Sequence, residues 1–198
     1  MGLNIEYIYG QTPLDEEEKN ELLIESITTR GELNEFEQMN IVQAIEWTLF
    51  RKFDRDYILS EDFVKELHMK MFGEVWAWAG KFRKTNKNIG VDKTQISVSL
   101  RQLLENAKYW IANNAFADDE IAVRICHEIV RIHCFPNGNG RHSRIIADVV
   151  ITHIFNKPLF SWGQSDLTEH TEARKLYISA IKEADNGNIG PLIMFARS

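Results

Sequence analysis

Apolar residues recur at steps of three and four along most of the chain, which is the spacing of amphipathic helices. Residues 35–53 show it clearly, with apolar side chains at Phe36, Met39, Val42, Ile45 and Leu49. The spacing predicts further helices over residues 15–28, 60–72, 99–113, 118–133, 140–155 and 168–184, and a last short helix at Pro191. Gly31 and Gly73 are expected to end the helices over residues 15–28 and 60–72. Residues 140–155 are apolar almost all round, which predicts a helix at the centre of a bundle.

The pattern changes between Gly80 and Val98, where apolar residues are scattered among lysine, threonine and asparagine. Gly90 lies inside this stretch and suits a tight turn. The change predicts a small β-hairpin over about residues 82–97. We therefore expect one all-α domain, a helical bundle that carries a single hairpin.

Composition narrows the class of protein. The chain has 198 residues, 44% of them hydrophobic, which is enough for one domain with its own core. A net charge of −6 argues against a surface that binds nucleic acid or anionic lipid as a whole, so any anion site must be local. The N-terminus lacks a signal-peptide pattern, and Cys126 and Cys134 form no C-x-x-C pair. We expect a soluble cytoplasmic protein with two reduced thiols and no membrane or direct nucleic-acid partner.

One stretch, HCFPNGNGRHSR from His133 to Arg144, departs from the helical pattern. Pro136 and two Asn-Gly pairs fit an ordinary turn between two buried helices, and this interpretation stays open. However, Arg141, His142 and Arg144 fall in the first turn of the next helix, where each cation opposes the helix dipole by about 0.3–1 kcal/mol. This arrangement favours a bound anion.

Gly138 and Gly140 allow backbone N–H groups to converge beside that helix N-terminus, which is typical of phosphate binding. Arg141 and Arg144 share a helix face and can grip neighbouring phosphates, so a di- or triphosphate is expected. His133 ends the preceding helix, where a neutral imidazole can take a proton from an attacking hydroxyl. A buried structural histidine is the alternative. The chain has no P-loop sequence, and its histidine spacing makes a metal site a weak alternative.

The same segment resembles the signature of the Fic family, H-x-F-x-[DE]-G-N-G-R-x-x-R. It matches at His133, Phe135, Gly138, Asn139, Gly140, Arg141 and Arg144. A weaker likeness extends from about Trp47 to Phe195. The chain most resembles the short bacterial Fic proteins known as mobile mystery protein B.

The resemblance implies a Fic-type helical bundle that transfers AMP from ATP to a Ser, Thr or Tyr hydroxyl of a target protein, with release of pyrophosphate. It implies that His133 is the general base and that Phe135 anchors the loop in the core. Asn139 and the backbone of residues 138–140 would hold the α- and β-phosphates. Arg141 would bind the β-phosphate and Arg144 the γ-phosphate.

Two further implications concern the metal and the target. Asn137 stands where the family usually has the Asp or Glu that binds Mg²⁺. An amide oxygen can ligate the ion without adding charge, so Mg²⁺ is expected to be held less tightly, or mostly by ATP phosphates and water. The predicted hairpin, with Lys84 and Ile89, would be the flap that aligns the target by strand addition, although its lysines also fit ordinary edge protection.

Many Fic proteins restrain themselves through an [ST]-x-x-x-E-[GN] helix ahead of the domain. Thr28 and Glu32 have this spacing, although Leu33 follows where Gly or Asn is usual. Such a glutamate would pair with Arg144 and exclude a competent γ-phosphate. The alternative is that Glu32 is a solvated charge near a helix end. The chain is accordingly divided into an N-terminal segment, residues 1–34, and a Fic domain, residues 35–198.

Two other functions stay open beside AMP transfer. One is a nucleotide-binding, toxin-like interaction protein that pairs with a small antitoxin and has lost turnover through Asn137. The other is a kinase-like relative of the death-on-curing branch. For AMP transfer, the expected partner is a protein with an exposed hydroxyl side chain, and the chain itself is a further candidate.

Overall fold

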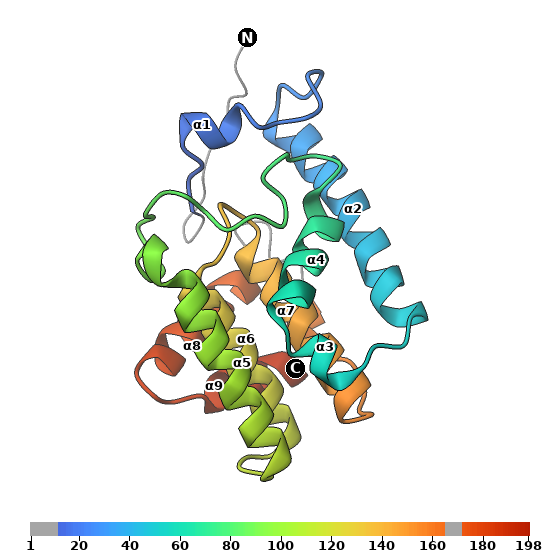
Figure 1. Ribbon diagram of the computed structural model, residues 1–198, viewed down its shortest axis with the longest axis vertical. Coiled ribbons are helices and arrows are strands. Elements are labelled where there is room, and N and C mark those ends of the chain that lie inside the picture. Colours follow the sequence, from blue (N-terminus) through green and yellow to red (C-terminus); the bar gives the residue numbers. More distant parts are fainter. Residues whose placement is uncertain (1–11, 165–171) are drawn as a thin grey trace.

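The computed structural model describes residues 12–164 and 172–198 (Figure 1). Within these ranges the only β pairing is an isolated antiparallel bridge between Leu22 and Trp76, which confirms the predicted all-α fold. The α-helices are α1 (Glu16–Lys19), α2 (Arg30–Phe50), α3 (Arg55–Ile58), α4 (Glu61–Phe72), α5 (Ile96–Ala112), α6 (Asp118–Ile132), α7 (Asn139–Val149), α8 (Glu172–Asp185) and α9 (Gly190–Arg197). Short turns η1 (Lys93–Gln95) and η3 (Trp162–Gln164) lie between them, and α7 continues as the π-helix η2 (Val150–Ile154). No helix in the described ranges combines the length and apolarity needed to cross a membrane.

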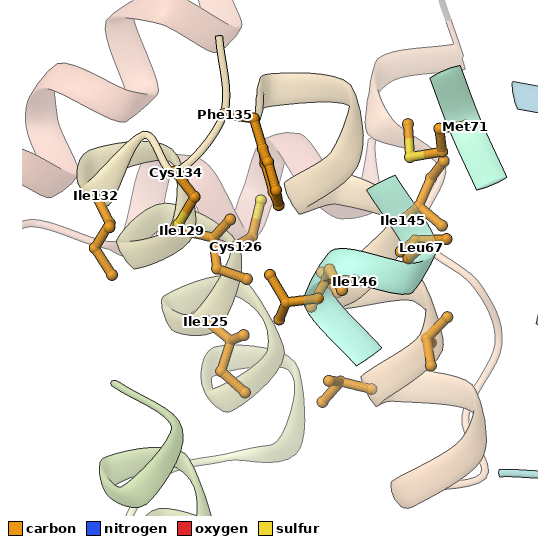
Figure 2. Close-up of a cluster of buried hydrophobic side chains, with 14 of the residues drawn as sticks. Leu67, Met71, Ile125, Cys126, Ile129, Ile132, Cys134, Phe135, Ile145 and Ile146 are labelled. Atoms are coloured by element: carbon orange, nitrogen blue, oxygen red, sulfur yellow. The ribbon is translucent and has the colours of Figure 1, made fainter. Parts of the chain in front are cut away.

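Helices α6 and α7 pack against each other at the centre of the bundle, and α4, α5 and α9 pack around them (Figure 1). Figure 2 shows side chains of α4, α6 and α7 meeting in one buried cluster, which Phe135 enters from the loop between α6 and α7. Each fully buried side chain of this kind contributes about 1.5–3 kcal/mol. The cluster includes Cys126 and Cys134, which are free, and burial raises the pKa of each thiol to about 12.

Local signals set the ends of several helices close to the predicted positions. Ser60 caps α4 by accepting a hydrogen bond from the Phe63 N–H at 3.2 Å, and Gly73 is its C-cap. Three acidic residues, Asp118 to Glu120, open α6, which is the favourable end of the helix dipole for negative charge. The predicted start of the helix at residue 168 lies outside the described residues.

The first predicted helix is wrong. Only Glu16–Lys19 is helical, because a capping box between Asp15 and Glu18 starts a turn that the chain leaves at once. Leu22 then forms its bridge with Trp76 instead of continuing the helix. Gly31, which was expected to stop a helix, lies in the first turn of α2.

Helix α2 is confirmed, but its apolar stripe faces outward. Met39 is 59% exposed and Phe50 is 87% exposed, and Phe36, Val42 and Leu49 are exposed as well. The buried face carries polar residues that find tertiary partners: Glu37 accepts a hydrogen bond from Trp76 Nε1, and Asn40 Oδ1 accepts one from the Glu74 N–H. The predicted boundary between residues 34 and 35 falls inside this helix.

The predicted hairpin over residues 82–97 is absent from the described structure, and the loop of residues 82–92, called here the flap loop, has no strands. The backbone of its two sides bonds to the end of α6 and the residues just after it, in place of a ladder between the two sides. The Arg83 N–H donates to the Cys134 carbonyl at 2.9 Å, and the Val91 N–H donates to the Ile132 carbonyl at 3.3 Å. The Arg83 side chain, in a residue only 3% exposed, donates to the carbonyls of His133, Thr85 and Val91 and replaces the missing ladder.

Candidate active site

The loop between α6 and α7 reverses the chain through two left-handed residues. His133 follows α6 with φ 57°, and Gly138 precedes α7 with φ 77°. A Cβ atom on Gly138 would lie 2.5 Å from Phe72 Cε2, which is far below normal contact. Glycine is therefore required at residue 138 for both its conformation and its close approach to Phe72.

Hydrogen bonds inside the loop fix its shape. The Asn139 side chain accepts from the Phe135 N–H at 3.0 Å and donates to the Phe135 carbonyl at 2.8 Å. Phe135 is buried and stacks on His68, with the ring centroids 3.7 Å apart. His68 Nδ1 accepts from the Gly80 N–H at 3.0 Å, so its Nε2 carries the proton and donates to the Asn137 carbonyl at 3.1 Å. The loop is held from inside by Asn139 and from α4 by His68.

A cavity of about 530 Å³ lies beside this loop. One wall comprises His133, the residues from Asn137 to Gly140, and the side chains of Arg141 and Arg144. Helix α8 adds Tyr177, Ile178 and Ile181 to the lining. The structure thus brings the predicted base and the predicted phosphate-binding residues to one cavity, whose volume is typical of small-molecule sites.

His133 presents a neutral imidazole to this cavity. Burial is the main cause that lowers its pKa to about 4, and the positive charge of Arg83 adds to it. Within the described part of the chain, neither ring nitrogen makes a hydrogen bond of normal geometry, although a contact with the Val130 backbone opposes the fall in pKa. A neutral imidazole with an unused nitrogen can accept a proton from an incoming hydroxyl.

The positive character of the cavity has two sources. No side chain in the described ranges caps α7, so the first N–H groups of this helix can bind an anion. Arg144 lies over the Tyr177 ring, with its Cζ 5.2 Å from the ring centroid, and Arg141 lies over Phe72 at 4.9 Å. Both guanidinium groups line the cavity. This arrangement can hold a chain of phosphates next to the His133 imidazole.

Comparison with known proteins agrees with this geometry, because residues 58–151 match the profile of the Fic/DOC family. This part of the chain, a little under half of it, is therefore similar to the Fic/DOC family. The protein adenylyltransferase Fic of Drosophila grimshawi is 26% identical over 136 residues, which cover 67% of this chain and 26% of that protein. The protein of the same name from Culex quinquefasciatus is 26% identical over 158 residues, or 78% of this chain and 29% of its own length. The chain thus spans between a quarter and a third of these relatives.

Solved Fic structures share the fold. Fic-1 from C. elegans superposes with a TM-score of 0.66 at 19% identity, covering 81% of this chain and 47% of its own. BepC from Bartonella tribocorum, solved with bound AMPPNP, gives 0.65 at 19% identity and covers 92% of this chain and 97% of its own. The Fic fold therefore extends over most of the chain.

In this structure Glu32 makes a different contact from the expected pair with Arg144. Glu32 is exposed and completes a capping box at the start of α2, where it accepts hydrogen bonds from the N–H groups of Thr28 at 2.9 Å and Thr29 at 3.0 Å. These bonds lower the pKa of its carboxyl group. The carboxylate is used by its own helix N-terminus, and no ion pair with Arg144 is present in the described structure.

A different acidic residue, Glu37, contacts Arg141, one of the predicted phosphate-binding residues. Glu37 is buried, pairs with Arg141 Nη1 at 2.6 Å and accepts a hydrogen bond from Trp76 Nε1 at 2.8 Å. Glu37 is not part of the cavity lining described above, so it holds Arg141 from behind the wall. The sequence offers no signal for this contact, because Glu37 lies on a helix face that the apolar spacing predicted to be exposed.

Asn137, which was expected to be a metal ligand, already uses its amide group. Its Oδ1 accepts from the Gly138 N–H at 2.7 Å, and its Nδ2 donates to the Thr12 carbonyl at 3.0 Å. In residues 12–164 and 172–198, no group of three or more His, Cys, Asp or Glu residues could hold a metal ion.

The two flap residues are placed differently. Ile89 lines the cavity, whereas Lys84 is exposed and is not among the lining residues. Gly90, between them and α5, packs directly on the base, since a Cβ atom there would lie 2.6 Å from His133 Cβ. The cavity also includes Thr12, Arg30 and Arg174, for which sequence analysis gave no signal.

Proposed function

We propose that this chain transfers AMP from ATP to a Ser, Thr or Tyr hydroxyl of a protein. The observation that carries the proposal is the neutral His133 imidazole, with no hydrogen bond of normal geometry among the described residues, beside a cavity that also receives the uncapped end of α7. The names of the insect relatives, protein adenylyltransferase Fic, support the same reaction.

The chemistry assigns each group a step. ATP binds with its phosphates on the N–H groups of residues 138–140, Arg141 and Arg144. His133 takes the proton of the target hydroxyl, whose oxygen bonds to the α-phosphorus as the bond to the β-phosphate breaks and pyrophosphate leaves. The phosphate charges raise the pKa of His133 from about 4 toward neutrality, because a nearby negative charge favours imidazolium.

Mg²⁺ enters this proposal as a complex with ATP. Asn137 brings no charge and its amide is engaged, so the phosphates and water would supply the ligands of the ion. Asn139, whose side chain is bonded to Phe135, contributes through its backbone.

The proposal also includes a docking surface for the target, a regulator and a cellular location. The flap loop, with Lys84 and Ile89, is the proposed docking place for a protein target. A small antitoxin is the proposed regulator, and the cytoplasm is the proposed location, in keeping with the two free thiols. The regulatory role expected of Glu32 stays a prediction, and in this structure its carboxylate caps α2.

The test is incubation of the purified chain and a cell lysate with ATP labelled at the α- or the γ-phosphate. AMP transfer predicts protein-bound label from the α position alone, and His133→Ala is expected to abolish it. Gln and Asn at residue 133 serve as matched variants that keep a polar side chain but cannot act as a base at neutral pH. Label from the γ position alone would indicate a kinase, and tight ATP binding without label would indicate an interaction module.

A further inference from the structure

The segment of residues 12–18 reaches the candidate active site from the N-terminal side. The Thr12 carbonyl accepts a hydrogen bond from Asn137 Nδ2 at 3.0 Å, within the same loop as His133. Thr12 also lines the cavity, and it is only 7% exposed. A residue with a hydroxyl group is therefore fixed at the wall of the cavity that His133 also lines.

The same segment is fastened to the flap loop. Thr85 Oγ1 donates to Asp15 Oδ2 at 3.0 Å, and Lys87 Nζ forms ion pairs with Asp15 and Glu18. The Lys87 and Glu18 side chains are only 6% and 10% exposed, so their pair is shielded from water and stronger than a surface pair. The segment is thus held by the flap at Asp15 and Glu18 and by the α6–α7 loop at Thr12.

Two side chains with hydroxyl groups line the cavity among the described residues, Thr12 and Tyr177. The Tyr177 ring lies against Arg144, its hydroxyl group is buried, and burial raises its pKa. A phosphate on Arg144 would be the γ-phosphate in the proposed binding mode, far along the chain from the α-phosphorus. Thr12, whose carbonyl is bonded to Asn137 in the loop between α6 and α7, is the acceptor that remains.

On the basis of the proposed AMP transfer, we infer that Thr12 is the site of an intramolecular AMP transfer. The Thr12 Oγ1 atom forms a bond to the α-phosphorus of ATP, the bond from that phosphorus to the β-phosphate breaks, and pyrophosphate leaves. The hydroxyl proton goes to the His133 imidazole. The product is an AMP ester of Thr12.

Tethering has a kinetic consequence that separates this reaction from modification of one chain by another. A nucleophile held in the site reacts at an effective concentration of about 1 mM or more, far above protein concentrations in an assay. The fraction of chains labelled per unit time is therefore independent of protein concentration. One chain takes up at most one AMP at this site.

The experiment compares the wild type with Thr12→Val and Thr12→Ser in α-labelled ATP, at protein concentrations that span about two orders of magnitude below this effective concentration. Valine keeps the shape of threonine and the backbone carbonyl but has no hydroxyl, whereas serine keeps the hydroxyl. We expect label in the wild type and Thr12→Ser, loss of label in Thr12→Val, and a rate per chain that does not change with concentration. Mass spectrometry of the tryptic peptide that ends at Lys19 should locate the AMP on Thr12.

That peptide also contains Tyr7 and Tyr9, so fragmentation must separate the three hydroxyl residues. AMP on either tyrosine, unchanged labelling of Thr12→Val, or a rate per chain that rises with concentration would overturn the Thr12 assignment while AMP transfer itself stands. A wild type that labels lysate proteins but not itself would do the same. Absence of α-label from every protein would overturn both this inference and the proposed function.

Discussion

Gly138 and Gly140 belong to the same sequence motif, but only Gly138 lies where the backbone conformation and the neighbouring atoms require glycine. Gly138 has φ 77°, and a Cβ atom there would meet Phe72 Cε2 at 2.5 Å and Phe72 Cζ at 2.6 Å. Gly140 is inside α7, and a Cβ atom there would meet no heavy atom within 4 Å. Alanine at each position therefore tests folding and nucleotide binding separately.

The magnitudes follow from these environments. At Gly138, a left-handed backbone disfavours alanine by roughly 1–2 kcal/mol, and overpacking against the buried Phe72 adds about 1–3 kcal/mol. The free energy of unfolding should fall by about 2–5 kcal/mol, which lowers Tm by roughly 5–15 °C in a chain of this size. At Gly140, alanine should raise the free energy of unfolding by up to about 1 kcal/mol, because it favours the helix.

The two substitutions should affect nucleotide binding differently from the way they affect stability. Gly140 lines the cavity, so the new methyl group would occupy space beside the N–H groups of α7. We expect Gly140→Ala to bind ATP about tenfold more weakly, which corresponds to the loss of about 1.4 kcal/mol, a typical single hydrogen bond. Gly138→Ala should be impaired in both properties.

Urea denaturation gives the free energy of unfolding, and calorimetric titration with a non-hydrolysable ATP analogue gives Kd. The reasoning is refuted if Gly138→Ala is as stable as the wild type. It is also refuted if Gly140→Ala unfolds more easily than the wild type, because then its backbone is strained in a way that the structure does not show.

Three further predictions rest on single contacts. Glu37→Gln should lower the free energy of unfolding by about 1–3 kcal/mol, because it leaves a largely buried Arg141 without its carboxylate, whereas Glu16→Gln, in an exposed pair, should leave urea unfolding unchanged. Gly90→Ala should push the flap loop away from His133, which faster limited proteolysis of residues 82–92 would reveal; an unchanged rate would contradict the close contact. The pKa of Asp148 is raised to about 7, chiefly by burial, so its stabilising contribution is present below pH about 4 and lost as pH rises through about 7. Asp148→Asn should therefore match the wild type near pH 4 and exceed it by at most about 4 kcal/mol above pH 8, and equal denaturation midpoints at both pH values would contradict this.

Much of the fold could be predicted because its signals are local. The cap at Ser60, the acids that open α6 and the apolar spacing of α7 act on their own segments, so the sequence alone locates these helices. The loop between α6 and α7 was equally readable, because cations in the first turn of a helix and a residue that must adopt positive φ need no knowledge of distant partners.

The features that sequence reasoning missed depend on contacts between distant segments. Apolar spacing predicted the position of α2 correctly, but it predicted the wrong face of the helix to be buried. Glu37 is on the buried face because it bonds to Trp76 and Arg141. The prediction of a hairpin was wrong because the Arg83 side chain supplies the hydrogen-bond donors that a second strand would have supplied. Thr12 is far from residue 133 in sequence, and only the bond to Asn137 joins them.

Arg83 also links the flap loop to His133, so it limits how far either can move without the other. One guanidinium group donates at once to the carbonyls of Thr85 and Val91 in the loop and of His133 at the end of α6. A protein that pulls on the loop must therefore either break a charge-assisted hydrogen bond in a dry environment or drag the imidazole along. In the proposed reaction, target binding at the flap loop and proton removal by His133 would therefore be coupled through Arg83, and lysine, which lacks the planar fork of arginine, could not make the same three contacts.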